Sequence, residues 1–171
     1  QWAFANNGAI HPQDRLDEIL PPGWQSRMRG TTDSERYFLA IAARLEDGAS
    51  VPEAVAAVVE DIFNRFEPTS LNAMLLGPDA LHIIAAHDPS RVPALRASSS
   101  SGSDSDELDT VFYDLHHRRR AQSFVVASSG CRQQRDEGWD PLPNMSLLRT
   151  GRGPPAASLA GLFQSPAPPR S

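Results

Sequence analysis

The chain has 171 residues, which is long enough for one domain with a sizeable hydrophobic core. Its net charge of −5 and isoelectric point near 5.5 give no reason to expect a nucleic acid or an anionic membrane as partner. A single cysteine excludes an intrachain disulfide framework and fits a reducing compartment, and no apolar run is long enough for a membrane helix, so we expect a cytoplasmic protein without a membrane partner.

The first ten residues predict a strand that ends in a turn. Trp2 and Phe4 alternate with smaller residues, as in a half-buried strand. Asn7-Gly8 then breaks the strand, because glycine adopts backbone angles that other residues avoid. The unhindered Gly8 amide and the Asn7 side-chain amide are two donors that suit an oxyanion formed during acyl transfer. The alternative is an ordinary hairpin turn, since Asn-Gly is the commonest short-turn sequence.

A capping box marks the start of the first long helix. Residues 32–35 read Thr-Asp-Ser-Glu, which places Thr32 at the N-cap and Glu35 at the third helical position. The helix is expected to end near Glu46, before Asp-Gly. Asp33 lies in its first turn, where the helix dipole favours a carboxylate whether or not it binds a ligand. A fixed aspartate also suits the ammonium group of an amino-acid substrate.

The remaining pattern favours an α+β fold with an antiparallel sheet. Helices come first and strands afterwards, without the alternation of a βαβ fold. We expect a short helix at 14–20, a second amphipathic helix capped by Ser50, a hairpin of strands 71–76 and 80–86, and shorter strands at 111–115, 122–128 and 145–149.

Two stretches have the composition of unfolded chain. Residues 97–107 are Ser-rich and acidic, and predict a mobile loop. Residues 151–171 are rich in Pro, Gly, Ser and Ala, and predict a disordered tail. The run Arg118-Arg119-Arg120 is typical of a solvated turn. The histidines lack the cysteine or carboxylate spacing of a metal site, so no metal is expected; they include His82, His87, His116 and His117.

The segments around Asn7 and Asp33 together resemble the glutamine site of class II (N-terminal-nucleophile) glutamine amidotransferases. In that family an Asn-Gly after a strand forms the oxyanion hole, which Asn7 and Gly8 match. A Thr-Asp-Ser-Glu-like element supplies the carboxylate that holds the α-amino group of glutamine, which Asp33 matches. Asn6 stands where the family usually has histidine. The likeness covers about residues 1–150 and is nearest to the stand-alone γ-glutamyl amidohydrolases.

The resemblance implies a fold and a reaction. The fold is the αββα sandwich of N-terminal-nucleophile hydrolases, with antiparallel sheets, of which this chain would supply a part. The reaction is hydrolysis of glutamine or a γ-glutamyl amide through a cysteine thioester, with transfer of the released ammonia in some members. No cofactor is implied, and a synthase or peptidase subunit is a partner that the family allows.

The family's nucleophile has no counterpart here. Its N-terminal cysteine uses its own α-amine as base, whereas this chain begins at Gln1. An upstream arginine that pairs with the substrate α-carboxylate is also missing. Cys131, the sole cysteine, has no neighbouring histidine in the sequence to lower its pKa. We therefore expect an N-terminally truncated chain that is inactive as a fragment. A non-catalytic remnant or interaction module is the alternative.

Overall fold

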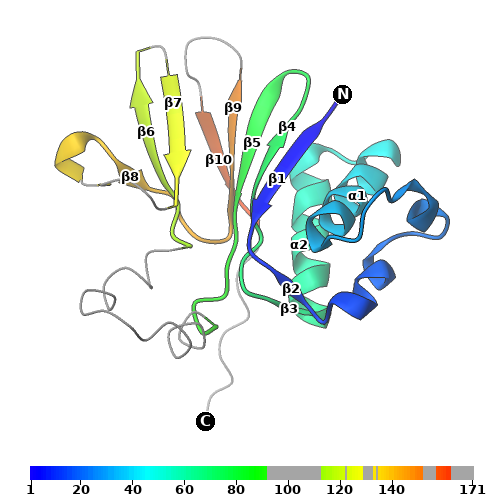
Figure 1. Ribbon diagram of the computed structural model, residues 1–171. Coiled ribbons are helices and arrows are strands. Elements are labelled where there is room, and N and C mark those ends of the chain that lie inside the picture. Colours follow the sequence, from blue (N-terminus) through cyan, green and yellow to red (C-terminus); the bar gives the residue numbers. More distant parts are fainter. Residues whose placement is uncertain (92–112, 122, 129–132, 134, 152–156, 163–171) are drawn as a thin grey trace.

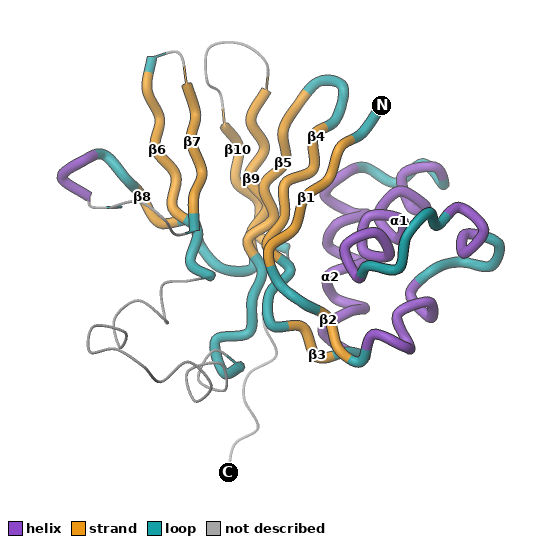
Figure 2. The backbone as a smooth tube through the Cα atoms, viewed as in Figure 1, coloured by secondary structure: helices purple, strands orange, loops and turns teal. Residues whose placement is uncertain are grey.

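The computed structural model describes residues 1–91, 113–121, 123–128, 133, 135–151 and 157–162. They form a pair of helices, a five-stranded sheet and a three-stranded sheet. The helices cover one face of the larger sheet and the smaller sheet lies toward its other face (Figure 1). Figure 2 shows the same separation of helical and strand segments.

The elements have the following bounds. The helices are α1 (Asp33–Glu46) and α2 (Val51–Arg65), with short 3-10 segments η1 (Gln13–Ile19), η2 (Trp24–Arg27) and η3 (Arg135–Glu137). The strands are β1 (Ala3–Asn7), β2 (Ile10–His11), β3 (Glu67–Pro68), β4 (Asn72–Leu76), β5 (Ala80–Ala85), β6 (His116–Arg120), β7 (Ser123–Ala127), β8 (Asp140–Pro141), β9 (Ser146–Gly151) and β10 (Ala157–Gly161).

All strand pairs in these sheets are antiparallel. The large sheet has the order β1-β4-β5-β9-β10, so β1 and β10 are its edges. The small sheet has the order β7-β6-β8, and β2 pairs with β3 separately. The expected α+β class is confirmed, and the layers are those of a helix–sheet–sheet part of the expected αββα sandwich.

Both long helices begin where their caps predict. The Thr32 hydroxyl accepts a hydrogen bond from the Glu35 amide at 3.2 Å. At α2 the capping box is complete, because the Glu53 carboxylate accepts from the Ser50 amide at 2.9 Å and the Ser50 hydroxyl accepts from the Glu53 amide at 3.5 Å. These caps satisfy backbone donors that a helix leaves free at its start.

The main core lies between the helices and the large sheet. Tyr37 of α1 is fully buried, and the Phe4 ring of β1 meets it edge-on at 5.1 Å between centroids. The sheet contributes Leu75 and Ile84 to this cluster. A helical period of 3.6 residues explains which α2 positions join it: Ala54, Val55, Val58, Val59 and Ile62.

A second, smaller cluster joins the two sheets. Successive residues of β5 point to opposite faces, so Ile84 packs toward the helices while Ile83 packs toward the small sheet. Ile83 meets Leu115 and Leu142 there, with Phe124 partly buried at the margin. Among the described residues, the buried members of this cluster come from β5, from β9 and from the segments next to β6 and β8: Ile83, Ala85, Leu148, Leu115 and Leu142.

Several sequence expectations differ from the structure. The residues from Tyr113 to Leu115 are not a strand; the strand is β6, which contains the arginine run. The prediction of a turn was wrong because the run pairs with β7 as a strand; Arg119 and Arg120 are exposed, and the Arg118 guanidinium is 4.7 Å from the Trp139 ring centroid. The expected helix at 14–20 is the 3-10 segment η1.

The large sheet also reaches beyond the expected domain boundary at residue 150. Within the segment 151–171, β10 pairs with β9 along its length, from Ala157 opposite Thr150 to Gly161 opposite Ser146. The expected mobile loop at 97–107 lies outside the described residues. In the part of the chain that is described, no helix has the length and apolar character needed to cross a membrane.

The α2 core contact yields a stability test. Ile62 is completely buried between α2 and the sheet, so Ile62→Ala should lower the free energy of unfolding by about 2–5 kcal/mol. Glu60→Ala on the exposed face of the same helix should stay within about 0.5 kcal/mol of the parent. Urea denaturation followed by circular dichroism measures both. Equal effects of the two substitutions would contradict the packing described.

Candidate functional site

The turn after β1 is pressed against the connection between β3 and β4. Gly8 has φ +150°, and a Cβ built on it would lie 2.0 Å from the Ser70 carbonyl oxygen. Two hydrogen bonds hold the turn there: the Ala9 amide donates to the Thr69 hydroxyl at 3.0 Å, and the Thr69 amide donates to the Ala9 carbonyl at 2.9 Å. Only glycine fits this position, because any side chain would overlap backbone atoms.

Two amide donors are available at this turn. Among the described residues, no group accepts a hydrogen bond from the Gly8 amide. The exposed Asn7 side chain donates from Nδ2 to the Ser128 hydroxyl across a long 3.5 Å contact. A weak contact to a hydroxyl is readily exchanged for a stronger one to an oxyanion. The turn thus presents a backbone and a side-chain donor one residue apart.

Asp33 lies beside the same turn. Its Oδ2 accepts from the Ile10 amide at 3.0 Å, two residues after Gly8, and its Oδ1 accepts from the Ser34 amide at 2.8 Å. The Ser34 hydroxyl in turn donates to the Asn6 side-chain oxygen. These contacts fix the carboxylate at the start of α1 while leaving it partly exposed. The carboxylate oxygens retain lone pairs for a cationic ligand.

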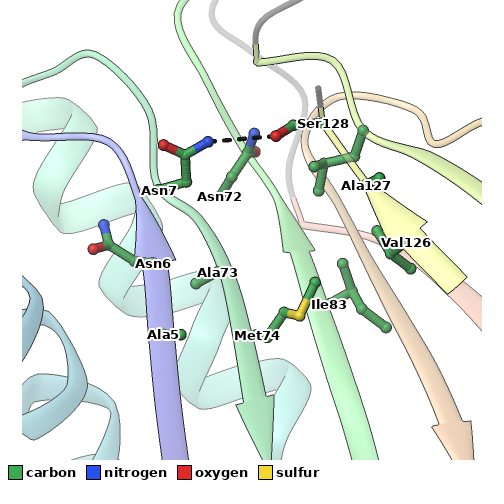
Figure 3. Close-up of a pocket in the computed structure, with 11 residues that line it drawn as sticks. Ala5, Asn6, Asn7, Asn72, Ala73, Met74, Ile83, Val126, Ala127 and Ser128 are labelled. Carbon is green, nitrogen blue, oxygen red and sulfur yellow. Dashed lines mark hydrogen bonds between the residues drawn. The ribbon is translucent and has the colours of Figure 1, made fainter. Parts of the chain in front are cut away.

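A pocket opens between the two sheets on the other side of β1. Its volume is about 330 Å³, within the range of small-ligand sites. Figure 3 shows the Asn7 amide at its rim, directed toward Ser128, and the Asn6 side chain directed away from it. The pocket is lined by Ala5, Asn6, Asn7, Asn72, Ala73, Met74, Ile83, Leu115, Val126, Ala127 and Ser128.

The turn separates Asp33 from this pocket. Along β1, successive side chains point to opposite faces, so Asn6 faces the Ser34 and Asp33 side while Asn7 faces the pocket. Asp33 and Gly8 do not line the pocket. The structure therefore brings the three predicted site residues to one turn. It places the carboxylate on one side of that turn and the apolar cavity on the other.

Two polar pocket residues carry no recognisable sequence signal. Asn72 is 2% exposed and links three segments, because its Nδ2 donates to the Tyr113 carbonyl at 2.6 Å and its Oδ1 accepts from the Ala86 amide at 2.9 Å. Ser128, directly after β7, meets Asn7 from 121 residues further along the chain. Only the packing of the two sheets brings Ser128 to Asn7, so no local sequence pattern places it at the site.

The surroundings of His82 and His87 are those of buried histidines in a protein core, not those of metal ligands. Burial lowers the pKa of His87, although Asp114 and Asp88 act in the opposite direction. Its Nε2 lies 3.5 Å from an Asp114 oxygen. Burial also lowers the pKa of His82, with a smaller contribution from Arg149. No group of three or more His, Cys, Asp or Glu within the described ranges has metal-site geometry.

The described residues offer no activated nucleophile at the turn. Among the described residues, Ser128 provides the only hydroxyl that lines the pocket, and its contact is with the Asn7 amide, not with a histidine or a carboxylate that would remove its proton. Cys131 lies outside the described residues. The site as described therefore contains donors and a carboxylate, but not the group that would attack a carbonyl carbon.

The close approach at Gly8 yields a test of the turn. Gly8→Ala should lower the free energy of unfolding by about 2 kcal/mol or more, because the methyl group overlaps the Ser70 carbonyl and the backbone angle is unfavourable for alanine. Gly151→Ala is the matched control, since no atom lies within 4 Å of its added Cβ. Thermal unfolding of both variants measures the difference. A Gly8 variant as stable as the control would refute the close approach.

Comparison with solved structures gives the fold a family context. No protein-family model matches the sequence, and no curated protein matches it. The chain is similar to a glutamine aminotransferase class-II domain protein from Silicibacter pomeroyi, with TM-score 0.58 and 19% identity over 94% of this chain and 68% of that one. The fold resemblance to class II glutamine amidotransferases that the sequence predicts is thereby confirmed.

Two further structures have the same fold. Glutamine phosphoribosylpyrophosphate amidotransferase from B. subtilis, complexed with ADP and GMP, aligns with TM-score 0.59 and 11% identity over 96% of this chain and 30% of that one. A predicted glutamine amidotransferase from Pseudomonas aeruginosa aligns with TM-score 0.55 and 14% identity over 92% of this chain and 60% of that one. The chain thus spans between about a third and two thirds of these proteins.

Proposed function

We propose that this chain forms the substrate-holding part of a class II glutamine amidotransferase-type site that binds glutamine or a γ-glutamyl amide. The observation that supports it most directly is the Asn7-Gly8 turn, with two amide donors, joined by a hydrogen bond from Ile10 to the fixed Asp33 carboxylate. In this proposal Asp33 accepts the substrate ammonium group, while the Asn7 Nδ2 and the Gly8 amide bind the γ-carbonyl oxygen.

The chemistry needs a thiol that the described residues do not provide. A cysteine thiolate attacks the γ-carbonyl carbon, and negative charge develops on the oxygen that faces Asn7 and Gly8. Collapse of the tetrahedral intermediate breaks the C–N bond, and the nitrogen takes a proton as it leaves. Water then attacks the thioester and releases glutamate. In this proposal the attacking thiol belongs to a cysteine that is not among the described residues.

The second candidate function is a binding module without turnover. The same turn and carboxylate would hold a γ-glutamyl compound, and no bond would break, because the described residues lack an activated nucleophile. In either case we place the protein in the cytoplasm. A synthase subunit that consumes ammonia, or a peptidase subunit that processes the remaining amine, is a partner suited to this chemistry.

The substrate-holding role predicts a binding defect in one variant. Glutamine should bind weakly to the chain, and Asp33→Ala should weaken binding about tenfold or more by removing the acceptor for the ammonium group. Asp79→Ala, which removes an exposed carboxylate from the β4–β5 turn, is the control and should bind as the parent does. Titrations followed by NMR measure both. Equal affinity of the Asp33 variant and the parent would exclude this role.

The missing nucleophile predicts an inactive chain. The 171-residue chain should release no glutamate from glutamine, whereas a protein extended by a front half with an exposed N-terminal cysteine should do so. In the extended protein, Asn7→Ala should lower kcat by about a hundredfold or more, as expected for loss of an oxyanion donor. Glutamate release measures each form. Robust, thiol-sensitive activity of the 171-residue chain would point to Cys131 and overturn the proposal.

A further inference from the structure

The apolar pocket beside Asn7 has no role in the chemistry described above. Ammonia is the leaving group when glutamine is the substrate, and it needs no more space than a water molecule. The pocket of about 330 Å³ is roughly ten times the volume that one water occupies in the liquid. A substrate with a larger leaving group would use this space.

Successive side chains of β1 point to opposite faces, and this determines on which side of the strand a larger leaving group would lie. The carboxylate that would hold the ammonium lies on the Asn6 side of the strand, and the pocket lies on the Asn7 side. In the orientation proposed above, a γ-glutamyl group with its ammonium at Asp33 and its carbonyl oxygen at the turn has its γ-nitrogen directed toward the Asn7 side of the strand. The nitrogen and anything attached to it then reach the pocket.

The pocket wall favours an apolar attachment. Ala5, Met74 and Ile83 line it from the large sheet, and Val126 faces them from β7. Met74 is 38% exposed, so part of its side chain is open to solvent at the pocket. Covering such surfaces with an apolar group removes them from water.

The polar groups on the wall do not change this preference. Both side-chain atoms of Asn72 already have partners in the Tyr113 carbonyl and the Ala86 amide. Ser128 lies at the rim beside Asn7, so apart from the Asn7 amide its hydroxyl is the one polar side-chain group among the described lining residues that a leaving group could meet. A polar leaving group would therefore lose its hydrogen bonds to water and find few replacements inside the pocket.

We propose, on the basis of the proposed function, that the preferred ligand is a γ-glutamyl amide of an apolar or aromatic amine, with the amine substituent in the pocket between the sheets. Glutamine binds through Asp33 and the turn alone. The additional burial of an aromatic ring makes the γ-glutamyl anilide bind at least about tenfold more tightly than glutamine.

Binding by the 171-residue chain tests this directly, without any need for catalysis. L-γ-glutamyl anilide and L-glutamine are titrated separately and their dissociation constants compared by calorimetry or NMR. Equal affinities overturn the inference, as does an absence of anilide binding. The expected result is the tenfold preference for the anilide, with the largest NMR shifts in Ala5, Met74 and Val126.

Substitutions that fill the pocket from β1 and from β7 test whether the amine substituent binds there. Ala5→Phe on β1 and Val126→Phe on β7 should each bring the affinity for the anilide down to that for glutamine, because both side chains face the space between the sheets. Ala3→Phe is the matched control, because Ala3 is exposed on the same face of β1 but does not line the pocket, and it should keep the preference. Retention of the preference in both pocket variants, with folding verified by thermal unfolding, overturns the inference.

Asp33→Ala separates this inference from the proposed function. It should weaken both ligands by the same factor and leave the preference for the anilide unchanged. If neither ligand is affected by Asp33→Ala, the proposed function fails, and with it the orientation on which the inference depends. If both are weakened but no pocket-dependent preference exists, the inference alone fails.

Discussion

The close approach of Gly8 to the Ser70 carbonyl is the constraint on which the site depends. It brings the end of β1 against the start of β4, and the two hydrogen bonds between Ala9 and Thr69 hold it there. The Ile10 amide is thereby in place for Asp33. A residue with a side chain at position 8 would push the strand end away and separate the amide donors from the carboxylate.

The helix layer and the small sheet give the two sides of this turn different chemistry. On the helix side, the cap of α1 places a carboxylate and a hydroxyl beside Asn6. On the other side, the small sheet covers β5 and β9 more fully than β1 and β4, and a pocket remains at that margin. The polar and apolar parts of the site thus follow from which layer faces each side of one strand.

The fold leaves its large sheet with open edges. Neither the outer side of β1 nor that of β10 pairs with another strand among the described residues. An edge strand offers free backbone donors and acceptors for a further strand. The solved amidotransferase structures that match this chain are longer than the part that it aligns with.

Local signals in the sequence determined the helices, the β4–β5 hairpin and the identity of the turn and carboxylate residues. Caps, helical periodicity and Asn-Gly act over a few residues, so they can be read without the fold. They were enough to indicate α1 and α2, and the resemblance to the amidotransferase glutamine site then singled out the candidate residues Asn7, Gly8 and Asp33.

Only the tertiary structure decided how these parts meet. Ser128 reaches Asn7 across 121 residues, and the arginine run becomes strand β6 by pairing with β7 and β8. Likewise β10 is a strand because it pairs with β9, although the composition of the segment around it is typical of a disordered tail. Such pairings depend on contacts between distant segments, and no local pattern encodes the partner. The pocket could not be predicted from the sequence for the same reason, because it forms only where the two sheets meet.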